Sequence, residues 1–267
     1  MIYKKSPTEI EIMRAAGVIL TDTLARIEDS IAPGVTTDAL DRIAQESIVG
    51  AGAKPSFKGY RGFPASICTS PNDVIVHGIP GPYVLREGDI ISVDVGVFHR
   101  GFHADSAWTF PVGDVSDEAM RLMRVTEESL AAAIAECKPG RRIGDVGHAV
   151  EQVAGAAGFS VVREYVGHGV GRALHEEPQI PNYGPPGRRE ILSPGMTLAI
   201  EPMVNSGGPA TRALADGWTV VTADGSLSAH FEHTVAITPD GPQVLTSRED
   251  PKTFGDSRPT NFVLESP

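Results

Sequence analysis

The sequence is poor in cysteine, in cations and in long apolar runs. Its two cysteines, Cys68 and Cys137, lack Cys-x-x-Cys spacing, which argues against a disulfide framework or a cysteine zinc site. No window approaches the roughly 18 apolar residues of a membrane span, and the start, MIYKKSPTEI, has no apolar run behind its lysines. We therefore expect a cytoplasmic protein without membrane contact, in which both thiols are small buried apolar side chains.

Positive charge is scarce along the whole chain. The 23 lysines and arginines stand against 34 aspartates and glutamates, so the net charge is -11. No basic stripe follows the chain, and nucleic acid is therefore not expected as a substrate. A hydrophobic content of 41% over 267 residues supports a substantial core in one large domain or two fused small ones.

Helix and strand patterns occur twice in the same order. A capping box at Ser6 to Glu9, with proline at the first helical position, predicts a helix over about 7–29. The remaining predicted helices run from about Thr37 to 50–52, from 116–118 to Pro139-Gly140, and over about 143–157. Strands are predicted at 90–98 and 104–112 as a hairpin, then at 196–202, 218–222 and 230–238, with a turn at Asp224-Gly225.

Matched residues relate the two halves. Pro33-Gly34 and Ala51-Gly52 recur 106 positions later as Pro139-Gly140 and Ala157-Gly158. Further matches, at offsets of 91, 107 and 127, are His77 with His168, Gly88 and Asp94 with Gly195 and Glu201, and His103 and Asp105 with His230 and Glu232. Such matches indicate a duplicated unit. We expect pseudo-repeats at about 7–113 and 116–240 within one domain over 1–250, followed by a polar tail at 251–267.

The changes in offset locate three insertions in this frame. They contain Tyr60, Phe63 and Cys68, then His175, and finally Trp218. If the repeated frame builds a symmetric site, these insertions must supply the asymmetry that a substrate requires.

Acidic residues lie within the predicted strands of both halves. Asp94 interrupts the apolar run ISVDVGV, and Glu201, Glu232 and Asp105 have similarly apolar neighbours. Taken singly, each acid could be a solvated strand end or part of an ordinary salt bridge, and each histidine a hydrogen-bonded core or surface residue. A buried ionised carboxylate needs a partner, however, and lysine and arginine are scarce here. The joint repetition favours a metal such as Mn, Fe, Co or Zn, with two ions roughly 3.5–4 Å apart able to activate water and polarise a carbonyl.

Five stretches resemble type I methionine aminopeptidases: VHGIP (76–80), GDIISVDVGVFHRGFHADSAWTF (88–110), GHGVGRALHEEP (167–178), LAIEP (198–202) and HFEHTVAIT (230–238). The resemblance covers about residues 5–245. It implies the α+β pita-bread (creatinase/aminopeptidase) fold, in which two pseudo-symmetric helix-helix-strand halves flank a curved antiparallel sheet. The internal duplication is what this fold would show.

The resemblance also implies residue roles. The ligands of two divalent ions (Co, Mn, Fe or Zn) would be Asp94, Asp105, His168, Glu201 and Glu232. Asp105 and Glu232 would bridge the ions, and Glu201 would be the general base for the attacking water. His175 would donate a hydrogen bond to the scissile carbonyl, and His77 would contact the nitrogen of the bond being cut.

Two further sets of residues follow from the resemblance. The pocket for a methionine side chain would fall on Tyr60, Phe63, Cys68, Leu174 and Trp218, with plain core packing as the alternative for each aromatic ring. The family often has tyrosine where this chain has Phe63 and phenylalanine where it has Leu174, which affects pocket shape rather than chemistry. A monovalent cation would be held at Asn72, Val74 and Ser228, where a turn-stabilising asparagine and a solvated serine would look the same.

The resulting hypothesis is a cytoplasmic dimetal aminopeptidase that removes the initiator methionine when the second residue is small. Its partners would be N-terminal methionine peptides and nascent chains, with transient ribosome contact, and the enzyme would be a monomer. One alternative is a Xaa-Pro peptidase of the same fold, although such enzymes usually have an extra N-terminal domain and here the first helix begins by residue 7. The other is a non-catalytic relative that binds ribosomes or nascent chains, but such relatives lose ligands that this chain retains.

Overall fold

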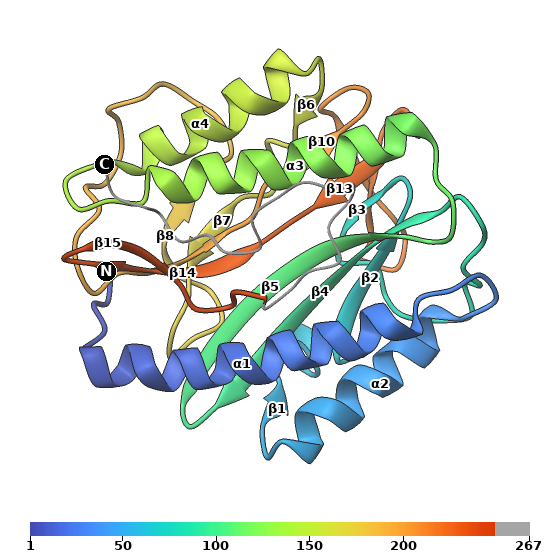
Figure 1. The fold of residues 1–267 in the computed structure, drawn as a ribbon, viewed down its shortest axis with the longest axis horizontal. Coiled ribbons are helices and arrows are strands. Elements are labelled where there is room, and N and C mark those ends of the chain that lie inside the picture. The colour runs from blue at the N-terminus through green and yellow to red at the C-terminus, as the bar shows by residue number, and fades with distance from the viewer. Residues whose placement is uncertain (249–267) are drawn as a thin grey trace.

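The computed structural model describes residues 1–248, so the predicted tail at 251–267 lies outside the described part. Two pairs of helices flank a set of strands. Figure 1 shows one pair along the lower edge of the molecule, the other along the upper edge, and the strands between and behind them. The limits of the single domain and of its two repeats remain predictions.

The lower pair consists of α1 (Pro7–Ser30) and α2 (Thr37–Gly50), and the upper pair of α3 (Asp117–Ala135) and α4 (Ile143–Ala156). The capping box forms as predicted, because the Ser6 hydroxyl accepts from the Glu9 backbone N–H and the Glu9 carboxylate accepts from the Ser6 N–H. Helix α1 packs on the central hairpin, and α3 packs on the strands of the second half.

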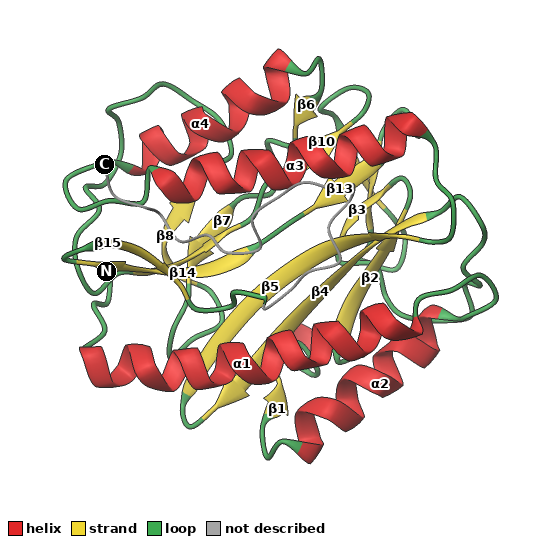
Figure 2. Cartoon of the chain, in the orientation of Figure 1, coloured by secondary structure: helices red, strands yellow, loops and turns green. Residues whose placement is uncertain are grey.

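The strands pair antiparallel in every ladder of residues 1–248, and they form four sheets (Figure 2). The first contains β1 (Lys54–Pro55), β2 (Ile67–Pro71), β4 (Ile90–His99) and β5 (Phe102–Pro111). The second has the order β15 (Gly241–Val244), β14 (His233–Thr238), β9 (Thr197–Ile200), β7 (Gly167–Gly169) and β8 (Glu176–Ile180). The third sheet has the order β13 (Ser228–His230), β10 (Met203–Asn205) and β6 (Ser160–Val161). The fourth has the order β11 (Thr211–Ala213), β12 (Val220–Thr222) and β3 (Val74–Val76).

The two halves share details of backbone geometry. Gly34 and Gly140 have φ values of 93° and 87°, which a side chain would disfavour, and their N–H groups donate to the carbonyls of Leu85 and Leu192. Isolated bridges join Thr36 to Val84 and Arg142 to Ile191, again at equivalent positions. The order of helix, helix and strands predicted for each half is therefore confirmed.

The strand predicted at 230–238 is wrong in one respect, because it is two strands. β13 ends at His230 and β14 begins at His233, and the run predicted at 196–202 is likewise divided between β9 and β10. The interruptions face each other: Pro202 has no N–H to offer a ladder, and its carbonyl accepts a bond from the Phe231 N–H. The predicted turn at Asp224-Gly225 is present, but the strands on either side of it, β12 and β13, belong to different sheets.

The core lies between the helices and the strands. A large apolar cluster includes Leu20 and Leu24 of α1, Val93 of β4 and Leu122 of α3. Gly17 is required where the chain after β15 crosses α1, since a Cβ there would lie 2.0 Å from the Leu245 carbonyl oxygen. Within residues 1–248, no helix combines the length and the apolar character that crossing a bilayer requires.

Candidate metal centre and substrate cavity

A cavity of about 300 Å³ opens between the two halves. Every residue predicted to bind metal, to act in catalysis or to form the methionine pocket lines it: Tyr60, Phe63, Cys68, His77, Asp94, Asp105, His168, Leu174, His175, Glu201, Trp218 and Glu232. The structure thus brings these sequence-predicted residues together, while their individual roles stay predictions.

Two of the acids come from the central hairpin. Asp94 of β4 pairs with Ala107 of β5, and Asp105 of β5 pairs with Gly96 of β4. The two carboxylates are therefore diagonal neighbours on one face of the hairpin. Gly96 is needed on that face, because a Cβ there would lie 2.6 Å from the ring of Phe57, which forms part of the cavity wall.

The other two acids lie in the facing interruptions of the second half. Glu201 follows the last residue of β9, and Glu232 precedes the first residue of β14. The ladder between β9 and β14 ends at the pair Ile200–His233, and the next ladder begins at Met203–His230. Because neither acid is in a regular pair, both side chains can turn into the cavity.

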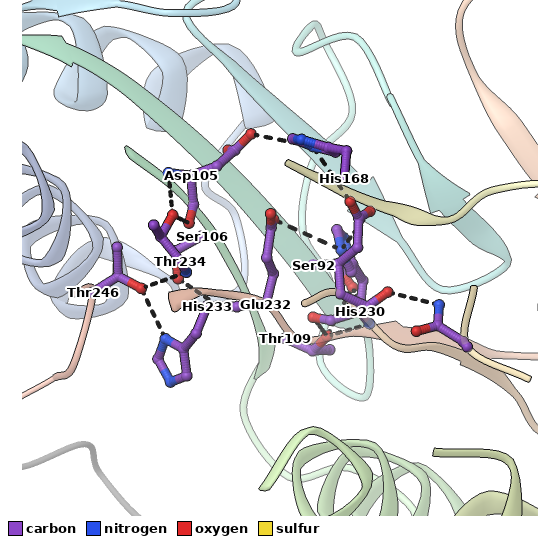
Figure 3. A network of polar contacts seen from close by, with 12 residues as sticks. Ser92, Asp105, Ser106, Thr109, His168, His230, Glu232, His233, Thr234 and Thr246 are labelled. Atoms are coloured by element: carbon purple, nitrogen blue, oxygen red, sulfur yellow. Dashed lines mark hydrogen bonds and ion pairs between the residues drawn. The ribbon is translucent and has the colours of Figure 1, made fainter. Parts of the chain in front are cut away.

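Hydrogen bonds join the halves beside these acids. The Thr234 hydroxyl accepts from the Asp105 N–H at 2.9 Å and donates to the Asp105 carbonyl at 2.8 Å. The Glu232 N–H donates to the Ala107 carbonyl, and the Ser106 hydroxyl donates to the Glu232 carbonyl at 2.6 Å. Figure 3 shows Asp105 and Glu232 held side by side by this network. The positions of the two proposed bridging acids are thus fixed by backbone contacts.

His168 presents one ring nitrogen to the acids. Its Nδ1 lies 2.9 Å from the Gly169 carbonyl oxygen, so Nδ1 carries the proton and Nε2 has a free lone pair. Nε2 lies 3.5 Å from Glu201 Oε1 and 3.9 Å from Asp105 Oδ2. Asp105, His168 and Glu232 each bring a ligand atom within 4.8 Å of one another.

A bound cation would offset the repulsion among the four acids. Burial, together with the charges of neighbouring acids, holds the pKa values of Asp94, Glu201 and Glu232 well above the usual range, and burial raises the pKa of Asp105 to about 7. Oxygens of three acids are buried without a hydrogen-bond partner among the described residues: Asp94 Oδ1, Asp105 Oδ1 and Glu232 Oε1. Orphaned hard oxygen donors beside one imidazole lone pair fit a divalent cation such as Mn, Fe, Co or Zn.

Two further histidines border the acids. His175 stacks on Tyr60 at 5.2 Å between ring centroids and lies 4.1 Å from the ring of His168. Burial lowers the pKa of His175 to about 3, so its ring is neutral and can donate through only one nitrogen. His77 has a φ of 60° and meets the edges of Tyr165 and Trp218. Burial also lowers its pKa.

An apolar pocket adjoins the acidic group. Phe63, Cys68 and Leu174 belong to one buried cluster, against which Tyr60 and Trp218 pack, and Phe63 meets Trp218 edge-on at 5.1 Å. Other residues that line the cavity or pack in the apolar pocket were not predicted from the sequence: Phe57, Val76, Ile79, Tyr165 and Met203. Phe57 and Ile79 lie close in sequence to predicted pocket residues, and this proximity was the only available signal for them.

His230 is the most notable residue that the sequence reading did not assign to the site. It is 2% exposed, and its Nε2 lies 3.7 Å from Glu201 Oε2 and 4.0 Å from Glu232 Oε2. The duplication had matched it to His103, which lies elsewhere, with its Nδ1 2.8 Å from the Ser56 hydroxyl. The match therefore identified the position but not its surroundings.

The proposed monovalent site remains a prediction. Asn72 and Ser228 are adjacent, because the Ser228 N–H donates to the Asn72 carbonyl at 2.9 Å, and Val74 begins β3. The Asn72 side chain donates to Asp89 and Tyr83 and accepts from the Ile90 N–H. This pattern is also that of a structural asparagine.

A buried ion pair holds the loop that carries His175. Lys5 Nζ lies 2.5 Å from Glu176 Oε2, and the two side chains are 4% and 6% exposed. The other oxygen of Glu176 accepts from the Ala173 N–H, which closes the turn before His175. A Cβ at Gly171 would lie 2.2 Å from Lys5 Cε, so a side chain there would displace the end of the lysine from its present position.

Breaking this pair is expected to destabilise the protein. The Glu176→Gln variant leaves the Lys5 ammonium buried without its counter-charge, and we expect the free energy of unfolding to fall by about 3–5 kcal/mol. Urea denaturation measures this change. Asp38→Asn, which breaks an exposed pair with Arg42, is the control and should have little effect. A loss in Glu176→Gln no larger than in the control would contradict the prediction.

Without metal, stability is expected to depend on pH in two directions. The folded protein holds protons on the four acids that the unfolded chain has lost, so its stability should fall as the pH rises through about 7, where Asp105 ionises. Burial lowers the pKa of His168 to about 4, so between about pH 4 and 6.5 this histidine contributes the opposite slope to that of the acids. Above about pH 6.5 only the acids still lose protons, so calorimetry of chelated protein should give a melting temperature that falls as the pH rises through about 7. Added Mn²⁺ should abolish the loss at high pH, and a flat alkaline profile in the chelated protein would refute the assignment.

Comparisons with known proteins agree with this geometry. The profile of metallopeptidase family M24 matches residues 11–239. Methionine aminopeptidase 1 of Bacillus subtilis is 55% identical over 92% of this chain and 99% of its own length, and methionine aminopeptidase of Escherichia coli K12 is 46% identical over 92% and 94%. The crystal structure of methionine aminopeptidase from Thermotoga maritima matches with a TM-score of 0.91 and 48% identity, covering 92% of this chain and 99% of that one. Prolidase from Pyrococcus furiosus, at 22% identity and a TM-score of 0.76, covers 92% of this chain and 66% of its own and shares the fold. With the family profile and near full-length relatives in agreement, the chain belongs to metallopeptidase family M24.

Proposed function

We propose that this protein is a methionine aminopeptidase that removes the initiator methionine from nascent proteins when the second residue is small. One observation carries the proposal: two buried acids, two partly buried acids and the free nitrogen of His168 meet in a cavity whose adjoining wall is apolar and aromatic. The relatives named methionine aminopeptidase, at 46–55% identity over nearly the whole chain, support it.

The residues that would hold two divalent cations are Asp94, Asp105, His168, Glu201 and Glu232. Bound there, Co, Mn, Fe or Zn would supply Lewis-acid polarisation of the scissile carbonyl and a water acidic enough to attack near neutral pH. Asp105, His168 and Glu232 bring ligand atoms within 4.8 Å of one another, and Asp105 and Glu232 each have an orphaned oxygen that a cation would satisfy.

The chain itself supplies proton transfer and orientation. Glu201 takes a proton from the attacking water, a role suited to a carboxylate whose pKa is raised by burial and neighbouring charge. His175, whose ring is neutral, donates a hydrogen bond to the scissile carbonyl oxygen as negative charge develops on it. His77, braced by Tyr165 and Trp218, contacts the nitrogen of the bond being cut.

The methionine side chain would occupy the apolar pocket beside the acids. A thioether suits a slot walled by aromatic rings and by the Cys68 thiol, since sulfur makes favourable contacts with ring edges. Phe63 presents a face without a hydroxyl, and Leu174 is smaller than an aromatic ring, so this pocket is more apolar and more open than the family pattern implies. We infer that branched or longer unbranched thioether analogues fit it comparatively well.

The biological setting follows from the proposed substrate. Nascent chains emerge in the cytoplasm, where the enzyme would meet them in transient contact with ribosomes and act as a monomer. A monovalent cation at Asn72, Val74 and Ser228 would hold β3 against β13, behind His77.

The deciding experiment is a metal-reconstituted peptidase assay. Chelated protein is supplied in turn with Mn, Co, Fe or Zn and given Met-Ala-Ser and Ala-Pro peptides. We expect methionine release from the first peptide and negligible cleavage of the second, because an alanine side chain is too short to fill the apolar pocket. Preferential Ala-Pro cleavage would instead select a Xaa-Pro peptidase of this fold, and no cleavage with any metal would indicate a non-catalytic relative.

A further inference from the structure

His230 has no role in the chemistry described so far, yet its backbone is held firmly. The Thr109 hydroxyl accepts from the His230 N–H at 3.0 Å and donates to the His230 carbonyl at 2.8 Å. The Ser92 hydroxyl lies 3.3 Å from the same N–H and 2.8 Å from the Thr109 hydroxyl. Two strands of the first half therefore fix a histidine that belongs to the second half.

The side chain of His230 is directed at two acids. Its Nε2 is buried and has no hydrogen-bond partner anywhere in the described chain, although it lies 3.7 Å from Glu201 Oε2 and 4.0 Å from Glu232 Oε2. Figure 3 shows the carboxylate of Glu232 directed toward the His230 ring. A buried ring nitrogen without a partner costs free energy, and a proton on Nε2 could be satisfied by these carboxylate oxygens.

Glu201 lies between two imidazoles. Its Oε1 is 3.5 Å from His168 Nε2, and its Oε2 is 3.7 Å from His230 Nε2. His168 donates a hydrogen bond from Nδ1 to the Gly169 carbonyl, so its Nε2 has a lone pair available for a cation. A hydrogen bond from His230 to Oε2 would fix the orientation of the Glu201 carboxylate, with Oε1 directed toward His168.

We propose that His230 is a positioning residue of the metal centre, whose Nε2–H donates to Glu201 and Glu232 and holds both carboxylates in ligand orientation. The proposal rests on the metal centre proposed above. The two acids lie in facing interruptions of the strands, so no regular strand pairing sets their side-chain angles. Turning either carboxylate by less than about 1 Å brings it within hydrogen-bond range of Nε2.

This role predicts how variants bind metal. Partners that orient ligands from outside the coordination sphere typically contribute about 10- to 100-fold to metal affinity. His230→Leu removes the donor, and His230→Asn keeps an amide that is too short to reach both acids. His230→Gln places an N–H donor near the position of Nε2.

The test is titration of the chelated full-length protein and its variants with Mn²⁺ by calorimetry, followed by visible spectroscopy of the Co²⁺-loaded forms. We expect His230→Leu and His230→Asn to bind Mn²⁺ about 10- to 100-fold more weakly and His230→Gln to bind within about threefold of the parent. At saturating Co²⁺ the spectra of all forms should coincide, because no ligand is lost. His148→Leu, which changes a half-buried histidine on α4, is the matched control and should bind as the parent does.

The outcomes separate the alternatives. Unchanged affinity in His230→Leu and His230→Asn, or a loss in His230→Gln equal to theirs, would overturn the positioning role. A changed Co²⁺ spectrum in every variant would overturn it too, and would show that His230 is itself a ligand. These readouts do not depend on peptide cleavage, so a parent that binds metal but releases no methionine would refute the proposed function alone.

Discussion

Asp105→Asn is expected to reduce methionine release by more than about 10³-fold and to lower the metal content of the purified protein. Asp105 is 4% exposed, one of its oxygens is orphaned, and it faces Glu232 across the seam between the halves. An amide has the same shape but offers only one oxygen and no charge, so a shared ligand is lost. The measurements are initial rates on Met-Ala-Ser and elemental analysis of the protein.

The control for this change is Asp41→Asn. Asp41 is also a partly buried carboxylate whose pKa is raised by burial, but its Oδ1 accepts from the Ser66 and Ile67 N–H groups, away from the cavity. An amide oxygen can accept the same two bonds, so this variant should keep its metal and most of its activity. Full metal content and activity in Asp105→Asn would show that Asp105 is not a ligand.

His175→Ala is expected to have a different signature. It should keep its metal and lower kcat by about 10²- to 10³-fold, the usual consequence of removing one donor to a developing oxyanion. The ring of His175 lies over Tyr60 and beside His168, but its loop is tied by the Lys5–Glu176 pair rather than by the acids. Metal content and kcat, measured on the same sample, separate the two roles.

A graded variant sharpens this prediction. His175→Gln retains an N–H donor of similar reach and should recover part of the lost kcat, whereas a residue needed only for packing would not be rescued in this way. Tyr60→Phe, which keeps the ring under His175 and removes only a hydroxyl, should remain near the parent rate. Loss of metal from His175→Ala would make His175 a ligand and overturn its assignment to the substrate.

The helices could be predicted from the sequence because residues close to each helix end determine where it begins and ends. Ser6 and Glu9 cap α1 through contacts only three residues apart, and Gly34 and Gly140 occupy backbone conformations that few other residues adopt. The strands of the central hairpin were equally readable from their apolar pattern. Helix ends and hairpin strands depend on residues near one another in the chain, so a single sequence is enough to predict them.

The paired interruptions at Glu201 and Glu232 could not be read in the same way. They depend on the contact of Phe231 with Pro202 and on the bonds that tie Glu232 to Ala107 and Ser106, all of which are remote in sequence. The acids themselves were found because the duplication repeats them. His230 was matched by the same duplication, but its direction toward Glu201 follows from the ladder break and could not be foreseen.

The hydrogen bonds that two threonines make between the two halves also have a consequence for the evolution of the gene. Thr234 holds Asp105, and Thr109 holds His230, each by a reciprocal pair of bonds from one half to the other. Each half contributes two of the four acids, and the cavity that holds them is lined by residues of both halves. Gene fission between β5 and α3 would therefore yield two products that each carry half of the acid group and lack the contacts that fix it, and selection must act on the two halves as a single heritable unit.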